Sequence, residues 1–502
     1  MGDRLAPVVV FVVALAAYVR TLMPGQAFDD WGEMQTVPHV LGIAHPTGYP
    51  TYILAAHLFE LLPIGSIAYR SNLFSGVLVA LAMASLTWTA VRLGVRPVVA
   101  GAAALATGAV GTVWAAATVA EVNPLHLALI ALLLDRSLAW ADGKRPLDLA
   151  LVGLITGLSL GNHLLTLFVA PFLGLFVLWS GKRAIIERPL LLLLPIATLM
   201  LGLTVYAYIP LAARSNPPLP YNHPTTLDGF LFLVTGTQFR SQEMAFLGLD
   251  GLRTLVDSLP ALLGLMLDRG AVVVPVLGIV GLVVLVVRRP SLGLALFAIL
   301  FVNALFWANY QQLEHYLLVP FLILGLGMAI ALEAIARTGE ERLSRTAGRA
   351  AAAATVAAGV LAAVLVTAAS LPAADRSGDH SGDEYVATMG AQLPQNAAIF
   401  SFWGASTPLW HYQLVLGQRP DLLVVDDTNI VYETTGTREQ RMLQVICQRP
   451  VYVVRPFAED LVPTRAEFTL QPAFTVTVGI GGPSGTYPLT VYHVIAPPDT
   501  CP

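Results

Sequence analysis

The residues best suited to chemistry lie in one short stretch near the start of the sequence. Asp30 and Glu33 are three positions apart, and Asp29 precedes them. If a helix begins near Asp30, both side chains lie on one face and can share a substrate or a proton. Partial desolvation by nearby lipid and aromatic surface would raise the pKa of such a carboxylate toward that of a useful base. A structural alternative remains open, in which Asp30 caps the helix and Glu33 completes a capping box.

A histidine follows these acids. His45 lies in a Gly- and Pro-rich segment, residues 41–50, which predicts a turn beside the carboxylates rather than a regular helix. An imidazole there can bind an anion or orient a general base, although a plain hydrogen-bonding role remains open. Tyr49, in the same segment, is a further candidate for binding substrate.

Other polar groups gather near the ends of apolar runs, at residues 70–72, 121–123, 162–163 and 310–316. Polar groups at such depth are costly in a membrane, so together they predict a polar cavity. Taken singly, each could instead cap or join helices. Arg70 and Arg240 are candidates for pairing with a phosphate, although an interfacial Arg can also reach lipid headgroups. Asn162 and His163 complete the candidate substrate-binding set.

The composition indicates which elements must position these residues. Of 502 residues, 56% are hydrophobic and 12% charged, and the mean hydropathy is +0.69; ordinary globular chains carry about 25% charged residues. Apolar runs long enough to cross about 30 Å of hydrocarbon recur up to residue 370. Because backbone polar groups must be paired inside lipid, we predict an all-α membrane region. About eleven transmembrane helices are expected, near residues 5–22, 73–91, 98–118, 121–139, 148–161, 163–180, 190–211, 271–287, 291–308, 316–336 and 350–370.

The basic residues predict an orientation. With a cytoplasmic N-terminus, every short basic loop lies on the cytoplasmic side, as the positive-inside rule requires. The loops at 23–72 and 212–270 and everything after 370 are then extracytoplasmic, and the first of these is expected to hold interfacial amphipathic helices. The basic positions are Arg92, Arg96, Lys144, Arg145, Lys182, Arg183, Arg188, Arg288, Arg289, Arg337, Arg342, Arg345 and Arg349.

A change of composition predicts two domains: residues 1–370 in the membrane, with the two outer loops, and a soluble extracytoplasmic domain at 371–502. Strands are expected at 397–403, 422–426, 451–455, 474–478 and 489–495, with helices near 382–392, 407–416 and 438–447, so the second domain reads as a small α/β fold. Cys447 and Cys501 both fall in it. An extracytoplasmic compartment permits a disulfide between them, but two free thiols remain an alternative.

The sequence disfavours several classes of function. The net charge of −4 argues against a nucleic-acid surface. No Walker A loop, dinucleotide-binding Gly motif, HExxH or CxxC pattern occurs, which disfavours an ATP-driven pump, a dinucleotide enzyme, a zincin and a thiol oxidoreductase. No cofactor is required by any motif, and the sequence leaves a divalent metal and the oligomeric state undetermined.

Three groups of residues together resemble a known family. They are Asp30-Trp31-Gly32-Glu33 with residues 41–50, then residues 68–73, and then the stretches 120–123, 157–163 and 236–240. This pattern is similar to the protein O-mannosyltransferase-related membrane family with a D-x-G-E motif, within the C-type glycosyltransferases. The likeness covers most of the membrane region and is less distinct after residue 370. It departs from the family at Thr47 and Leu164, which bear on donor or acceptor details.

The resemblance implies a GT-C-like fold and an enzyme of the plasma membrane. Such an enzyme takes a sugar, mannose or another hexose, from a polyprenyl-phosphate donor and transfers it with inversion to an extracytoplasmic hydroxyl, favouring protein Ser/Thr over a cell-envelope glycan or lipid. By this resemblance Asp30 is the catalytic base and Glu33 orients the acceptor or shares the proton. Arg70, Arg240 or His163 would neutralise the departing phosphate.

Two rival functions remain. A transporter or flippase of a lipid-linked sugar would use the same carboxylates to couple ion flow, but it would favour charges near the bilayer midplane. A binding protein whose work is done by the soluble domain would need far fewer spans.

Overall fold

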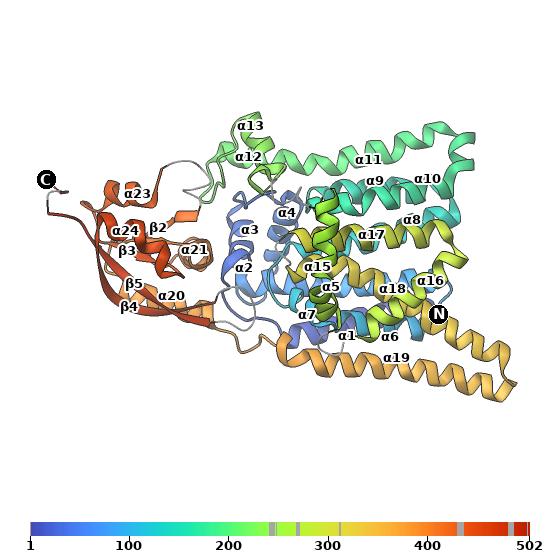
Figure 1. Cartoon of the computed structure of the whole chain (residues 1–502). Coiled ribbons are helices and arrows are strands. Elements are labelled where there is room, and N and C mark those ends of the chain that lie inside the picture. Colours follow the sequence, from blue (N-terminus) through green and yellow to red (C-terminus); the bar gives the residue numbers. More distant parts are fainter. Residues whose placement is uncertain are drawn as a thin grey trace.

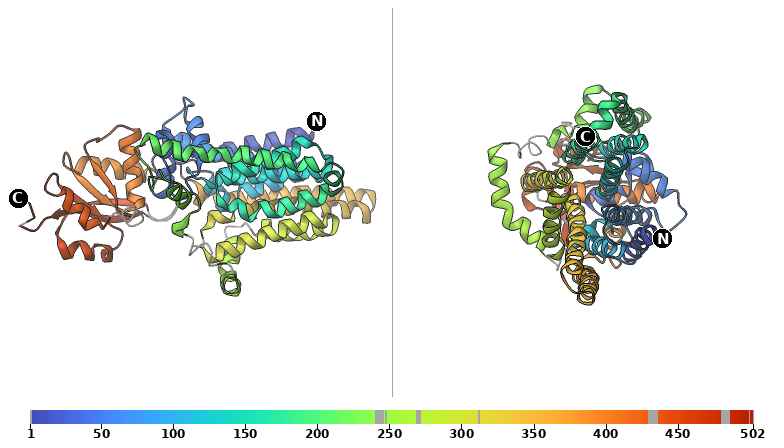
Figure 2. Two further views of the ribbon diagram at one scale, coloured as in Figure 1. Left: turned by 90° about the horizontal axis from the view of Figure 1, so that it is seen from above. Right: turned by 90° about the vertical axis from the view of Figure 1, so that its right-hand side faces the viewer.

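The computed structural model describes residues 2–239, 246, 248–267, 272–310, 313–428, 436–479, 486–498 and 500–501. A bundle of long helices forms one part of the molecule, and a small α/β domain is attached to one end of it (Figure 1). The N-terminus lies at the opposite end of the bundle, as two further views show (Figure 2). The bundle helices are α1 (Gly2–Arg20), α5 (Ile67–Arg92), α6 (Pro97–Gly108), α7 (Gly111–Ala116), α8 (Asn123–Gly143), α9 (Pro146–Leu160), α10 (Ala170–Glu187), α11 (Leu193–Leu203), α16 (Val273–Arg288), α17 (Pro290–Asn309), α18 (Leu318–Arg342) and α19 (Arg345–Ala374).

Each of the eleven predicted spans falls on helical structure. Within the described residues, six helical segments are long and apolar enough to cross a membrane: Ile67–Arg92, Asn123–Gly143, Pro189–Ser215, Pro290–Asn309, Glu314–Arg342 and Arg345–Ala374. Pro97–Gly108, Pro146–Leu160 and Val273–Arg288 are apolar but shorter. Helices α6, α9 and α17 have Pro in their first positions, where the missing N–H costs nothing.

Close helix packing explains a glycine in the bundle. A Cβ on Gly281 of α16 would stand 1.7 Å from the carbonyl oxygen of Gly327 on α18. Small residues let the two backbones approach, and van der Waals contact is the main source of helix association in lipid. The helix pair therefore depends on the absence of side chains at these positions.

The basic loops gather at the end of the bundle that is remote from the α/β domain. Arg92 lies 2.9 Å from Asp135, Arg289 lies 3.2 Å from Asp142, and Arg96 lies 3.5 Å from Glu333. These ion pairs join the basic residues to acidic residues of α8 and α18 that are distant in sequence. The predicted grouping of these basic loops on one side is therefore present in the fold.

Shorter elements cover the other end of the bundle. They include α2 (Asp29–Met34), α3 (Val37–Val40), α4 (Pro50–Glu60), α12 (Tyr208–Ser215), α13 (Leu227–Val234) and α15 (Leu249–Leu267), with 3₁₀ segments at Leu164–Phe168, Pro189–Leu192, Thr204–Ala207, Thr237–Phe239 and Glu314–Leu317. In Figure 1, α15 runs across the direction of the long helices.

The α/β domain begins after α19, four residues beyond the predicted span. Its sheet has the order β2-β1-β3-β5-β4, with β1 parallel to β2 and β3, and β5 antiparallel to β3 and β4. All five predicted strands and three predicted helices are present. The elements are α20 (Ser381–Gln392), β1 (Ala398–Ser401), α21 (Trp403–Trp410), a π-helical segment His411–Val415, β2 (Leu423–Asp426), α23 (Arg438–Val445), β3 (Val451–Val454), a 3₁₀ segment Ala458–Leu461, α24 (Val462–Glu467), β4 (Thr469–Gly479) and β5 (Thr486–Ile495).

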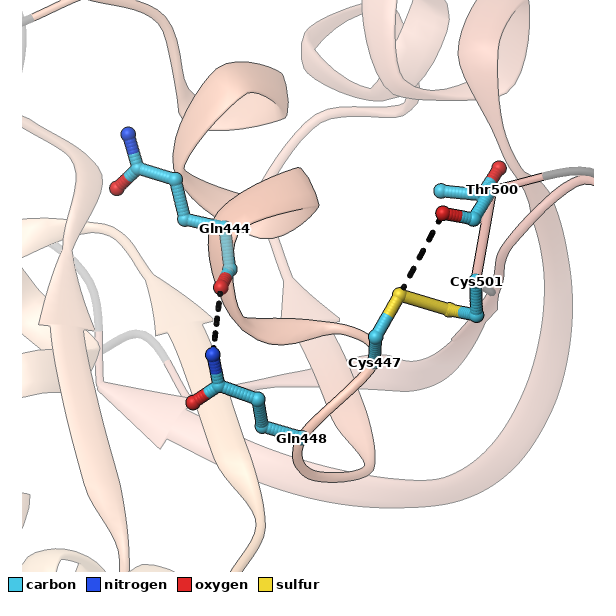
Figure 3. The surroundings of a disulfide bond; sticks show 5 residues. All are labelled: Gln444, Cys447, Gln448, Thr500 and Cys501. Carbon is cyan, nitrogen blue, oxygen red and sulfur yellow. Dashed lines mark hydrogen bonds between the residues drawn. A yellow bond between two sulfur atoms is a disulfide. The ribbon is translucent and has the colours of Figure 1, made fainter.

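Cys447 and Cys501 form a disulfide, so the pairing left open by the sequence is resolved (Figure 3). The bond ties the segment after α23 to the segment after β5. It closes a loop between residues 54 positions apart.

The two domains are joined by more than the linker. Phe28 is inserted into the core of the α/β domain, where its ring packs against Tyr385 at 5.4 Å between centroids. The backbone N–H of Gln26 donates to Asp383 on α20, and the Arg376 guanidinium lies over the Trp31 ring. Helix α2 and the chain that leads into it are therefore held by the α/β domain.

Candidate active site

Helix α2 presents Asp30 and Glu33 to His45, as their spacing predicts. His45 lies in the bend before α4, and both its backbone N–H, at 2.8 Å, and its ring Nδ1 bind the Glu33 carboxylate. Asp30 Oδ2 lies 3.9 Å from His45 Nε2. Residue 28, not Asp30, is the N-cap of α2, and no side chain caps the helix. The alternative role of these acids as a capping box is therefore not present.

The two acids have different surroundings. The Glu33 side chain is buried, with 2% of its surface exposed, whereas 51% of the Asp30 side chain is exposed. Asp30 is thus the carboxylate that a substrate can reach. Glu33 is instead hydrogen-bonded to His45.

The hydrogen bonds around His45 indicate that its ring carries two protons. Burial raises the pKa of Tyr49 well above its ordinary value, so its hydroxyl keeps its proton, and that proton is donated to the Pro46 carbonyl at 2.8 Å. The 3.0 Å contact between the Tyr49 oxygen and His45 Nε2 therefore needs Nε2 to donate. With Glu33 ionised, Nδ1 donates to its carboxylate as well, and the ring is then an imidazolium.

The electrostatics agree with this assignment. Burial acts to lower the pKa of His45, but the charges of Glu33 and Asp30 outweigh it and raise the pKa to about 9. Burial raises the pKa of Glu33, and the His45 imidazolium opposes that rise. The result is a cation held beside Asp30.

Asp30 and His45 line a cavity of about 280 Å³ at the end of the bundle that faces the α/β domain. Residues from both domains and from widely separated stretches of sequence form its wall. The other lining residues are Met34, Pro46, Thr47, Tyr49, Glu121, Val122, Asn123, His163, Leu164, Tyr221, Phe239, Phe306, Tyr310, Leu313, His315, Tyr316, Trp403 and Thr428.

Two lining residues come from the α/β domain and were missed by the sequence analysis. The indole N–H of Trp403 donates to Asp30 Oδ1 at 2.8 Å, and the Trp403 backbone N–H donates to Thr428 Oγ1 at 3.2 Å. Trp403 follows the parallel strand β1, and Thr428 follows β2. The carboxyl ends of parallel strands are the usual position of ligand contacts in open α/β sheets. The positions of Trp403 and Thr428 directly after two predicted strands could therefore have indicated them.

The predicted binding residues are only partly brought together. Tyr49 and His163 line the cavity, whereas Asn162 is fully buried behind it and donates to the Val122 carbonyl. The Arg70 guanidinium is turned away and donates to the carbonyls of residues 60, 64 and 65. Arg240 lies outside the described residues. The clusters at 121–123 and 310–316 do contribute to a polar cavity, as predicted.

A divalent metal would find its donor set at Asp30, Glu33 and His45, whose ligand atoms lie within 4.8 Å of one another. A metal ion in this set would compete with the hydrogen bond between Glu33 and His45 Nδ1, because a ring nitrogen binds a metal only when it carries no proton. Binding would require this hydrogen bond to break.

Comparison with known proteins bears on the region that holds the site. Residues 30–186 match the family model described as the protein O-mannosyl-transferase TMEM260 N-terminal domain. The protein O-mannosyl-transferase TMEM260 from Mus musculus is 32% identical over 237 residues, which are 46% of this chain and 34% of that protein. The chain thus matches about a third of the length of this curated relative. The predicted resemblance to the O-mannosyltransferase-related family is confirmed.

The whole fold is similar to a solved membrane protein. The crystal structure of ArnT from Cupriavidus metallidurans bound to undecaprenyl phosphate aligns with a TM-score of 0.64 over 99% of both chains, at 13% identity. The same protein in the apo state gives 0.63 over 97% of both chains. These similarities confirm the predicted polytopic, GT-C-like membrane fold.

Proposed function

We propose that this chain is an inverting membrane glycosyltransferase that transfers a hexose from a polyprenyl-phosphate donor to a hydroxyl acceptor. One observation carries the proposal: a substrate-accessible carboxylate, Asp30, lies in the wall of a polar cavity at one end of a GT-C-like bundle. A hydroxyl that attacks a sugar needs a base within hydrogen-bonding distance. Asp30 is placed to be that base.

The reaction forms one bond and breaks one. The acceptor oxygen bonds to the anomeric carbon as the bond from that carbon to the phosphate oxygen breaks on the opposite face. The hydroxyl proton passes to Asp30, and the lipid phosphate leaves with the bonding electron pair. The transition state has oxocarbenium character, as in glycoside hydrolysis.

The His45–Glu33 pair positions the base. The His45 ring lies beside Asp30, and Glu33 fixes that ring by accepting hydrogen bonds from both the backbone N–H and Nδ1. We assign Glu33 the role of a positioning residue, as an alternative to orienting the acceptor or sharing the proton. Its burial supports this assignment.

The departing phosphate needs positive or hydrogen-bonding partners. No Arg or Lys is found among the lining residues that the structure describes, and His163 and His315 are the remaining imidazoles of the wall. His163 Nδ1 accepts the Leu165 N–H, so its neutral ring carries the proton on Nε2 and can donate it. Arg240 stays a candidate because it follows Phe239, which lines the cavity. Arg70 would have to give up its three carbonyl partners.

The donor, sugar and acceptor are proposed from the relatives. The mouse relative is named for O-mannosyl transfer, which favours mannose and a protein Ser/Thr acceptor. The ArnT structure contains undecaprenyl phosphate, which favours a polyprenyl-phosphate carrier. The basic end of the bundle favours a cytoplasmic N-terminus in the cell membrane and an extracytoplasmic cavity.

The test is transfer by the purified protein in detergent or vesicles. It is given a short-chain polyprenyl-phosphate mannose and a Ser/Thr peptide, and the release of polyprenyl phosphate and the glycopeptide are measured. Asp30→Asn should reduce both by about 10²- to 10⁴-fold, since it removes the base. Asp228→Asn, a matched change at an exposed residue of α13, should leave them unchanged.

The other outcomes identify the rivals. Movement of intact donor across vesicles without release of lipid phosphate would indicate a transporter or flippase. Transfer to a glycan or lipid hydroxyl but not to peptides would keep the enzyme and replace the acceptor. Full activity of the Asp30→Asn variant would show that Asp30 is not the base.

A further inference from the structure

A second cavity of about 180 Å³ adjoins the first one. It is formed between α3, the outer segment 219–223 and helix α21 of the α/β domain. Its lining residues are Glu33, Val37, Ile43, Leu219, Pro220, Tyr221, His223, Trp403 and Trp410. The proposed reaction gives this cavity no role.

Two aromatic residues line both cavities. Tyr221 and Trp403 meet edge to face, with ring centroids 6.1 Å apart, and we call this pair the Tyr221–Trp403 wall. Trp403 of this wall also donates its Nε1–H to Asp30. A ligand in the second cavity is therefore separated from the proposed base by the thickness of aromatic side chains.

The segment that forms the far side of the second cavity is fixed by backbone pairing. Ile43 N–H donates to the Leu219 carbonyl at 2.8 Å, and Tyr221 N–H donates to the Ile43 carbonyl at 3.2 Å. These bonds join the outer loop to the bend that holds His45. The second cavity is thus built on the same bend as the catalytic residues.

We propose that this second cavity is an acceptor subsite that takes an apolar side chain of a polypeptide, within two residues of the Ser or Thr that receives the sugar. The inference rests on the proposed transferase function and adds a sequence preference to it. In an extended chain, side chains two positions apart point the same way and lie about 7 Å apart. That spacing lets one peptide place its hydroxyl in the first cavity and an apolar side chain in the second.

The chemistry of the lining favours an apolar side chain over a sugar ring. Three aromatic rings and four aliphatic or proline side chains face this cavity. Of its two ionisable residues, Glu33 is buried and already bound to His45, which leaves His223 at the rim. A sugar ring would need several polar partners for its hydroxyls, and unmet hydroxyls are costly when buried.

The experiment measures kcat/KM for peptides that differ only at the positions flanking one Thr. Peptides with Leu or Phe within two residues should exceed the Gly peptide by at least about tenfold. Leu219→Trp should fill the cavity, abolish this preference and raise the acceptor KM for the Leu peptide. Leu227→Trp, at an exposed position of α13 outside the lining, is the matched control. If Leu219→Trp fails to fold, Leu219→Ala should shift the preference toward Phe.

The results separate this inference from the function on which it rests. Equal kcat/KM for the Gly, Leu and Phe peptides would overturn the subsite and keep the transferase. A free oligosaccharide that replaces the peptide as acceptor, and is lost with Leu219→Trp, would overturn it in favour of a sugar subsite. Failure to cleave donor under any condition would instead overturn the proposed function.

Discussion

The indole N–H of Trp403 donates a 2.8 Å hydrogen bond to Asp30 Oδ1, although 373 positions separate the two residues. The bond connects the membrane bundle to the α/β domain at the proposed base. It occupies one carboxylate oxygen and leaves Oδ2 on the side of His45. The α/β domain is therefore part of the candidate site and not only an attachment to it.

Trp403→Phe should keep an aromatic side chain, although a smaller one, and remove the donor. A hydrogen bond to a charged group contributes about 1.5–3 kcal/mol, so we expect kcat/KM for transfer to fall by about 10- to 100-fold. Steady-state transfer with saturating donor measures this. Trp179→Phe, at an exposed position on α10, is the control. Wild-type kinetics for Trp403→Phe would show that the bond does not position Asp30.

The composition and short-range patterns predicted the fold because each depends on local physics. Apolar runs specify helices in lipid whatever their partners, and alternating strands after residue 370 specify a sheet. Asp30, Glu33 and His45 were found because they lie within 16 positions of one another in a recognisable pattern.

What the sequence did not predict depends on tertiary placement. Trp403 reaches Asp30 only because Phe28 enters the α/β core, and no local pattern encodes that insertion. Arg70 fits a phosphate ligand by residue type, yet its guanidinium ends the turn after α4 by binding three carbonyls. Residue type thus identified candidates, and packing decided which of them share the cavity.

Glu33→Gln should move the alkaline limit of activity. The folded-state pKa of His45, about 9, lies above its unfolded value of about 6.5, so the ion pair is fully present below the lower value and is lost as pH rises through about 9. Removing the Glu33 charge should lower the His45 pKa by about 1–3 units. The pH profile of kcat should then fall at correspondingly lower pH. An unchanged alkaline limb would show that another group controls it.

Removing the disulfide should weaken the α/β domain alone. With Cys447→Ser and Cys501→Ser together, we expect a loss of about 2–4 kcal/mol in the free energy of unfolding of that domain. Neither cysteine lines the cavity, so transfer at low temperature should be retained. Denaturant unfolding followed by far-UV circular dichroism measures the loss, and reductant should reproduce it in the wild type. Loss of transfer at low temperature would contradict the separation of this bond from the site.

The Gly32→Ala substitution should displace α2 from the α/β domain at the candidate site. A Cβ at Gly32 would stand 2.3 Å from the Ala27 carbonyl oxygen and 2.7 Å from Thr407 Oγ1 of α21. Because Ala27 contributes a backbone atom, α2 must shift and carry Asp30 away from Trp403. A displacement of about 1 Å can cost about 10²-fold in rate, so transfer should fall by that order while the bundle stays folded. Gly174→Ala on α10, where an added Cβ meets nothing within 4 Å, is the matched control. Limited proteolysis between the domains should be faster in Gly32→Ala only, and equal proteolysis with equal transfer would show that α2 tolerates the methyl group.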